Sequence, residues 1–94
     1  AVLVSERNKK TSPLKKEIDK LEKLIIKTEE ELETNQQELI KLSSSGDSSK
    51  LVDLYKEVAL QEAKVEETFE LLELVQNQFD EIVEEYEKNL NKLI

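Results

Sequence analysis

The apolar residues of this chain recur at alternating steps of three and four along two long segments. This spacing averages 3.5 residues, which is typical of α-helices that pack against one another in a coiled coil. In the first segment the seam residues are Leu14, Ile18, Leu21, Ile25, Thr28, Leu32, Asn35, Leu39 and Leu42. In the second they are Leu51, Leu54, Val58, Gln61, Val65, Thr68, Leu72, Val75, Phe79, Ile82, Tyr86, Asn89 and Leu93. The pattern therefore predicts two helices whose seams face each other.

Two helix-breaking residues set the expected bounds of these helices. Ser12 followed by Pro13 predicts a helix start, because proline is best tolerated in the first helical turn, where its missing N–H costs nothing. The single glycine, Gly46, can adopt the left-handed conformation that ends a helix, and Asp47 or Ser48 would cap the next one. The predicted organisation is a basic linker tail at 1–11 and a helical hairpin at 12–94, with a helix at 13–43, a turn at 44–47 and a helix at 48–92.

A turn this short folds the second helix back along the first. The predicted fold class is therefore all-α, an antiparallel two-helix coiled-coil hairpin with the second helix longer than the first. When Leu42 faces Leu51, the register places Asn35 opposite Val58 and Gln61 opposite Leu32. Each polar seam residue then meets an apolar one, which fixes a register at some expense of stability.

The predicted second helix outruns the first and carries an apolar strip that has no partner in the first helix. The strip consists of Ile82, Val83, Tyr86, Leu90 and Leu93. We expect the tail, through its apolar residues at 2–4, a second copy of the chain or the rest of a longer protein to cover it. A monomer is favoured, with a homodimer as the alternative.

The four aromatic residues are Tyr55, Phe69, Phe79 and Tyr86. They could act as stacking platforms for bases. However, Phe79 and Tyr86 occupy seam positions and Phe69 lies beside the seam, so a packing role is the favoured interpretation.

The missing residue types exclude most enzyme classes. Without His or Cys there is no imidazole base, no thiol nucleophile and no zinc site of the usual ligand types. One glycine is too few for a phosphate-binding loop. The acidic runs lack the spacing of a calcium loop, and no apolar run approaches the roughly 18 residues of a membrane span. We expect no catalytic residue, no metal site, no cofactor and no contact with a membrane.

Charge is unevenly distributed along the chain. Residues 1–28 carry a net charge of +4 and residues 29–94 a net charge of −12. Lys16, Lys20, Lys23 and Lys27 are spaced four, three and four apart, so they line one outward face of the first helix. Such a row could contact the phosphates of nucleic acid, although a solvated coiled-coil face is the plainer interpretation, and the acidic second helix would repel a polyanion.

Three stretches resemble the C-terminal coiled-coil domain of ABC-F ATP-binding proteins. They are Lys-Thr-Ser at 10–12, Lys-Glu-Ile-Asp-Lys-Leu-Glu at 16–22 and Lys-Leu-Val-Asp-Leu-Tyr-Lys-Glu at 50–57, the last two on either side of a turn that bears serine and aspartate. The resemblance covers roughly residues 9–88. It implies a C-terminal accessory domain that follows two ATP-hydrolysing cassettes in a cytoplasmic protein, and we interpret the first residue, Ala1, as a cut inside such a longer chain.

The same resemblance implies the partners and the contact residues. ABC-F proteins act mostly on ribosomes, and the C-terminal hairpins of some members bind DNA, so the expected partner is DNA, ribosomal RNA or the ribosome. The implied nucleic-acid-binding residues are the bases of the lead-in and first helix: Lys9, Lys10, Lys16, Lys20, Lys23 and Lys27. The alternative function is that of a coiled-coil hairpin for protein–protein docking or spacing, which would engage its partner through the strip from Ile82 to Leu93.

Overall fold

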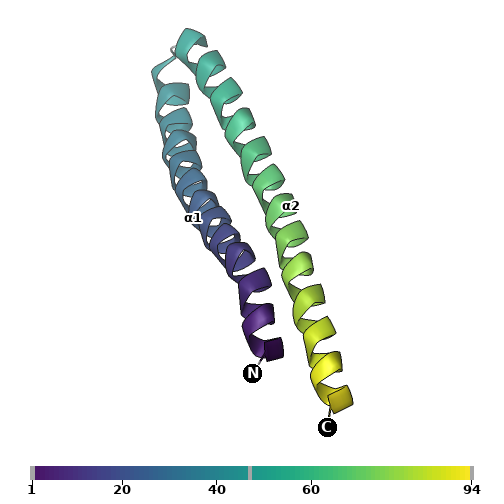
Figure 1. Ribbon diagram of the computed structural model, residues 1–94. Helices are drawn as coiled ribbons and strands as arrows, with labels where there is room; N and C mark the ends of the chain where they lie inside the picture. Colours follow the sequence, from purple (N-terminus) through teal and green to yellow (C-terminus); the bar gives the residue numbers. More distant parts are fainter. Residues whose placement is uncertain (1, 47, 94) are drawn as a thin grey trace. The chain divides into compact units, whose positions relative to one another are not determined.

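The computed structural model describes residues 2–46 and 48–93. It contains two helices, α1 at Val2–Ser45 and α2 at Ser48–Leu93 (Figure 1), and the described residues include no strand. This confirms the predicted fold class, an all-α two-helix hairpin. The second helix is the longer one, with 46 residues against 44.

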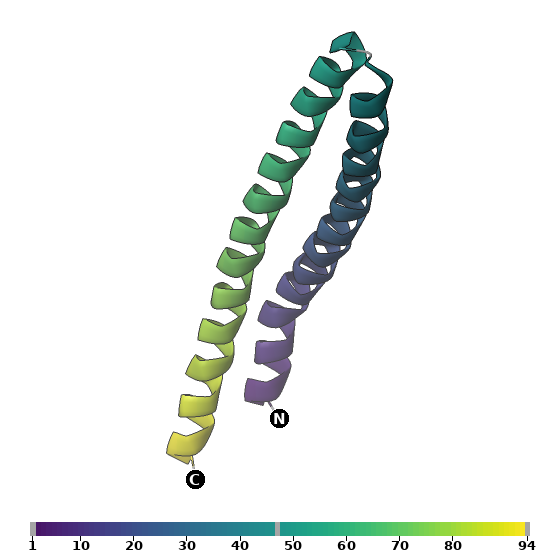
Figure 2. The same cartoon turned by 180° about the vertical axis from the view of Figure 1, so that it is seen from behind.

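The chain divides into two compact units, each built from a part of both helices. The terminal unit comprises Ala1–Glu22 and Glu70–Ile94, and the central unit comprises Lys23–Phe69. In each unit the α1 and α2 segments lie side by side from both viewing directions (Figures 1 and 2). In the terminal unit Lys10 lies against Tyr86 and Lys15 against Phe79, so the residue numbers rise along α1 as they fall along α2. The two segments are therefore antiparallel.

The seam predicted from the apolar spacing is the buried side of both helices. Every seam residue whose side chain the structure describes is buried or half-buried, and only the side chain of Leu93 lies outside that description. Burying an aliphatic side chain completely stabilises a fold by about 1.5–3 kcal/mol. The apolar residues that are buried here are Leu21, Ile25, Val58 and Tyr86.

Threonine hydroxyls in the seam are satisfied within their own helices. In the central unit, Thr28 donates to the Leu24 carbonyl at 2.8 Å and Thr68 donates to the Lys64 carbonyl at 2.6 Å. In the terminal unit, the Thr11 hydroxyl donates to the carbonyl four residues earlier, at 2.9 Å. These bonds let a polar side chain occupy a buried position, because an unpaired buried hydroxyl costs about 1–3 kcal/mol.

The turn follows the predicted chemistry of a helix end. Gly46 has φ of +78°, the left-handed conformation expected of it, and its N–H donates to the Leu42 carbonyl at 3.2 Å. Residues with a Cβ rarely adopt this conformation, which explains why the single glycine of the chain stands here. The second helix begins at Ser48, and the proposed cap at Asp47 lies outside the described residues.

The predicted linker tail at 1–11 and the helix start at Pro13 are wrong for the residues that the structure describes. α1 begins at Val2 and runs through Pro13 without a break. Proline inside a helix removes one N–H···O bond and costs about 3 kcal/mol. The early turns of α1 gain in return a buried position for Thr11 and a contact between Lys10 and the Tyr86 ring. Tertiary packing therefore overrides the local rule that places proline at a helix start.

The extra turns of α1 cover part of the apolar strip of α2. Ile82, Val83 and Leu90 are half-buried, and the Tyr86 side chain is 6% exposed. Lys10, Pro13 and Leu14 line one hollow of the terminal unit together with Ile82. The segment predicted as a tail is thus a helical partner of the strip.

We predict that replacing Pro13 with alanine stabilises the chain. Alanine restores the missing N–H···O bond in an exposed part of the helix, and after allowance for the greater freedom of the unfolded chain the gain is about 2 kcal/mol. Urea unfolding followed by far-UV circular dichroism measures it. Ser12→Ala is the matched control, because the neighbouring exposed position offers only about 0.5 kcal/mol from helix propensity. A Pro13→Ala variant no more stable than this control would mean that Pro13 begins the helix.

Candidate nucleic-acid interface

The six lysines predicted to contact nucleic acid all lie on α1 and are all exposed. Four belong to the terminal unit and two, Lys23 and Lys27, to the central unit. Their exposure follows from the helical period, since each lies outside the seam. Their surroundings differ, however. Lys10 contacts an aromatic ring, Lys9 and Lys16 line one hollow, and Lys27 lines another.

Lys10 is engaged by an aromatic ring of α2. Its ammonium lies 5.4 Å from the centroid of the Tyr86 ring, within the range of a cation–π interaction. Hydrogen bonding to the Tyr86 hydroxyl raises the pKa of Lys10 above its usual value, and the nearby carboxylates of Glu85 and Glu6 act in the same direction. Lys10 therefore covers the buried tyrosine, and a polyanion that recruited this ammonium would have to draw it away from the ring.

A second lysine, Lys15, lies over Phe79 with its ammonium 5.8 Å from the ring centroid. The packing role predicted for Phe79 and Tyr86 agrees with their burial, since Phe79 is half-buried and Tyr86 is buried. The packing role predicted for Phe69 is wrong, because its side chain is 48% exposed. Tyr55 is more open still, at 60%.

One hollow in the terminal unit is lined by α1 alone. Its residues are Ser5, Asn8, Lys9, Ser12, Pro13 and Lys16. Successive members of this set are three residues or one residue apart, so they form two neighbouring rows on one face of the helix. Two ammonium groups, two hydroxyls and one side-chain amide meet on this face, and none of the six residues is acidic. We call this set of residues the α1 hollow.

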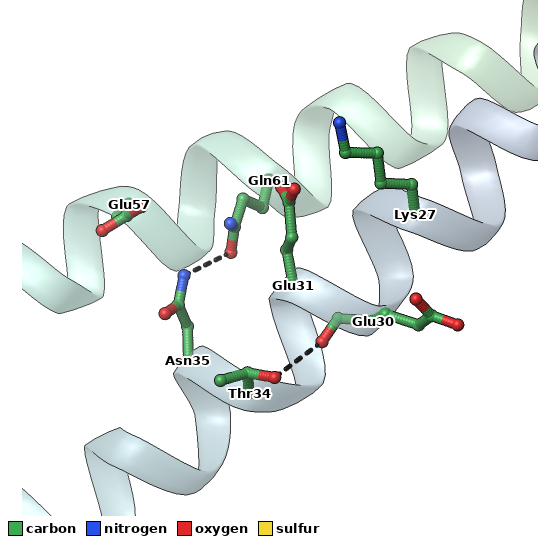
Figure 3. Close-up of a pocket in the computed structure, with 7 residues that line it drawn as sticks. All are labelled: Lys27, Glu30, Glu31, Thr34, Asn35, Glu57 and Gln61. Atoms are coloured by element: carbon green, nitrogen blue, oxygen red, sulfur yellow. Dashed lines mark hydrogen bonds between the residues drawn. The ribbon is translucent and has the colours of Figure 1, made fainter.

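The hollow in the central unit has the opposite electrostatic character. It is lined by Lys27, Glu30, Glu31, Thr34 and Asn35 from α1 and by Glu57 and Gln61 from α2 (Figure 3). The lining holds one ammonium and three carboxylates, so its charged side chains sum to a net negative charge. A phosphate that approached Lys27 would be repelled by Glu30 and Glu31, which follow it by one turn of α1.

A polar bridge joins the two helices inside this hollow. Asn35 extends from α1 and its Nδ2 donates to Oε1 of Gln61 on α2 at 3.0 Å (Figure 3). The sequence register placed Asn35 opposite Val58 and Gln61 opposite Leu32, with each polar residue against an apolar one. The expectation that each of these polar residues meets an apolar partner and not another polar one is wrong, because the two amides contact each other. The amide side chains are long enough to reach between neighbouring layers of the seam, where each satisfies part of the hydrogen bonding of the other.

The described residues hold no cluster of His, Cys, Asp or Glu that could bind a metal ion. Among the described helices, neither is long and apolar enough to cross a membrane.

Comparisons with protein-family models, with curated proteins and with solved structures find no match to this chain. The resemblance to the C-terminal domain of ABC-F proteins therefore stays a prediction from the sequence.

We predict that Asn35 and Gln61 are energetically coupled. In a double-mutant cycle of Asn35→Ala and Gln61→Ala, the double variant should lose less stability than the sum of the two single losses. The difference should be about 0.5–1.5 kcal/mol, the net value of one hydrogen bond. Urea unfolding of the four proteins measures this coupling. Asn35→Ala with Gln36→Ala is the matched control, because Gln36 is exposed and its substitution should add to that of Asn35. Additive losses in both cycles would show that the hydrogen bond contributes nothing to the fold.

Proposed function

We propose that this chain is a non-catalytic helical hairpin that contacts nucleic acid, DNA or ribosomal RNA, through four exposed lysines of α1, namely Lys9, Lys16, Lys20 and Lys23. The observation that carries the proposal is the free state of these groups. Within the part of the chain that the structure describes, Lys9, Lys16, Lys20 and Lys23 are exposed, and no carboxylate forms an ion pair with them. Their ammonium groups can therefore meet phosphates without first breaking an internal ion pair.

Counterion release gives such a face its affinity. Each lysine that neutralises a phosphate frees a condensed cation, so that log K falls with log salt by about 0.9 for each contact on double-stranded DNA. The excess of acids after residue 28 opposes non-specific approach from other sides and favours a partner that meets the basic part of α1. The hairpin thus acts by positioning a polyanion, and it needs no cofactor.

We further propose that the hairpin is the C-terminal accessory domain of an ABC-F ATPase. The support is the sequence resemblance over roughly residues 9–88. In such a protein the ATP-hydrolysing cassettes would lie upstream, the whole would be cytoplasmic, and this domain would contact the ribosome or DNA. The docking alternative is weaker, because the strip that motivated it is covered in the terminal unit, with Tyr86 buried beneath Lys10.

We predict that charge reversal of Lys16, Lys20 and Lys23 to glutamate weakens binding more than 10-fold at moderate salt. If each lysine meets one phosphate, the slope of log K against log salt should become shallower by about three. Fluorescence anisotropy with a labelled DNA duplex and a structured ribosomal RNA fragment, at several salt concentrations, measures both quantities. Far-UV circular dichroism should show unchanged helicity, since all three side chains are exposed.

The matched control reverses Lys56, Lys64 and Lys88, three exposed lysines of α2, and changes the net charge by the same amount. It should weaken binding much less than the α1 variant. If the triple α1 variant binds as the parent chain does, the three lysines do not contact nucleic acid and are only a solvated face of the coiled coil. Equal losses in both variants would mean that net charge, and no particular face, governs binding.

A further inference from the structure

The α1 hollow combines two ammonium groups with neutral donors and has no carboxylate in its lining, whereas the hollow around Lys27 has neutral donors together with three carboxylates. Lys9 and Lys16 are seven residues apart, about 10.5 Å along the helix, so their ammonium groups would meet different phosphates. Ser5, Asn8 and Ser12 lie on the same face between and beside them. A phosphate oxygen accepts hydrogen bonds from hydroxyl, amide and ammonium donors alike.

The serine hydroxyls of the α1 hollow are not committed to the helix backbone. Serine and threonine inside helices often donate to a carbonyl three or four residues earlier. Thr11, Thr28 and Thr34 of α1 all do so. Within the described residues, by contrast, the Ser5 and Ser12 hydroxyls make no hydrogen bond, and neither does the Asn8 amide. These three groups are free to donate outward.

The other candidate lysines lack this combination. Lys10 is held over the Tyr86 ring, and Lys27 shares its hollow with Glu30, Glu31 and Glu57. Asp19 follows Lys16 by one turn and places a carboxylate beyond the end of the α1 hollow. The lining that combines ammonium groups with neutral donors and holds no carboxylate therefore extends from Ser5 to Lys16.

We propose that the α1 hollow is a binding site for the sugar–phosphate backbone of nucleic acid, with Lys9 and Lys16 neutralising phosphates and Ser5, Asn8 and Ser12 donating hydrogen bonds to them. This inference rests on the proposed function and narrows it to one face of the terminal unit. Because every donor meets the backbone and none is assigned to a base, the site reads no sequence. It takes DNA and RNA phosphates by the same contacts.

Two pairs of variants test the charged part of the site by fluorescence anisotropy with the labelled DNA duplex over a range of salt. Lys9→Gln with Lys16→Gln should weaken binding about 10-fold or more and make the salt slope shallower by about two. Lys27→Gln with Lys41→Gln removes the same charge from two other exposed lysines of α1 and should leave the slope nearly unchanged. A control pair that loses as much affinity and slope as the Lys9 and Lys16 pair would overturn the assignment to this hollow.

A third variant tests the neutral donors. Asn8→Ala with Ser12→Ala should weaken binding about 2- to 10-fold while the salt slope stays the same, because no charge has been removed. Circular dichroism should show helicity at least equal to that of the parent chain, since alanine favours the helix. Unchanged affinity in this variant would overturn the role of the neutral donors.

The parent chain serves as the test of the proposed function itself. Failure of the parent to bind the duplex and the ribosomal RNA fragment at low salt would remove the proposed function and this inference together. If the parent binds, and the Lys9 and Lys16 substitutions leave its affinity unchanged while the control pair lowers it, the proposed function stands. The assignment of the phosphate site to the α1 hollow is then wrong.

Discussion

The fold depends on one narrow contact, the seam along which α1 and α2 bury their apolar faces. The described residues offer no third element that could cover the other sides of either helix. Most helical stability in proteins comes from packing an amphipathic face, and here that packing has a single partner in each unit. Burial is correspondingly thin, with only Leu21, Ile25, Val58 and Tyr86 buried among the described apolar residues. An unpaired polar group in so thin a seam would cost a large share of the stability, and the Thr28 hydroxyl and the Asn35 amide each donate a hydrogen bond there.

The sequence predicted what depends on periodicity and missed what depends on the facing helix. The steps of three and four identified the seam, and the single glycine located the turn, because both follow from local backbone geometry. Pro13 misled the prediction because a local preference was outweighed by packing against Tyr86. A signal was present, since Arg7 and Thr11 continue the four-and-three spacing upstream of Leu14. Following that spacing through the proline would have extended the helix correctly.

The polar bridge shows a different limit of the sequence reasoning. Pairing residues by register treats each side chain as reaching only its opposite neighbour. Asn35 and Gln61 reach diagonally instead, because two unsatisfied amides gain more from each other than from aliphatic neighbours.

The candidate interface could be predicted only as a row of exposed lysines. Helical spacing places Lys9, Lys16 and Lys27 outside the seam, and all three are exposed. What distinguishes them is their neighbours. Glu57 of α2 lines the same hollow as Lys27, and the sequence alone does not show that the two helices share this hollow. Only the structure shows that the Ser5 and Ser12 hydroxyls make no hydrogen bond, because many serines in helices donate to a backbone carbonyl of their own helix.

The two tyrosines provide intrinsic fluorescence that can be used to follow the two units separately. There is no tryptophan, so tyrosine dominates the intrinsic fluorescence, and each unit holds one tyrosine. Tyr55 in the central unit is open to water, while Tyr86 in the terminal unit is buried with Lys10 over its ring. A soluble quencher reaches the first ring at once and the second only when the early turns of α1 leave it. Quenching of the Tyr86 fluorescence therefore measures local opening of the terminal unit in the unlabelled protein, separately from the unfolding of the chain as a whole.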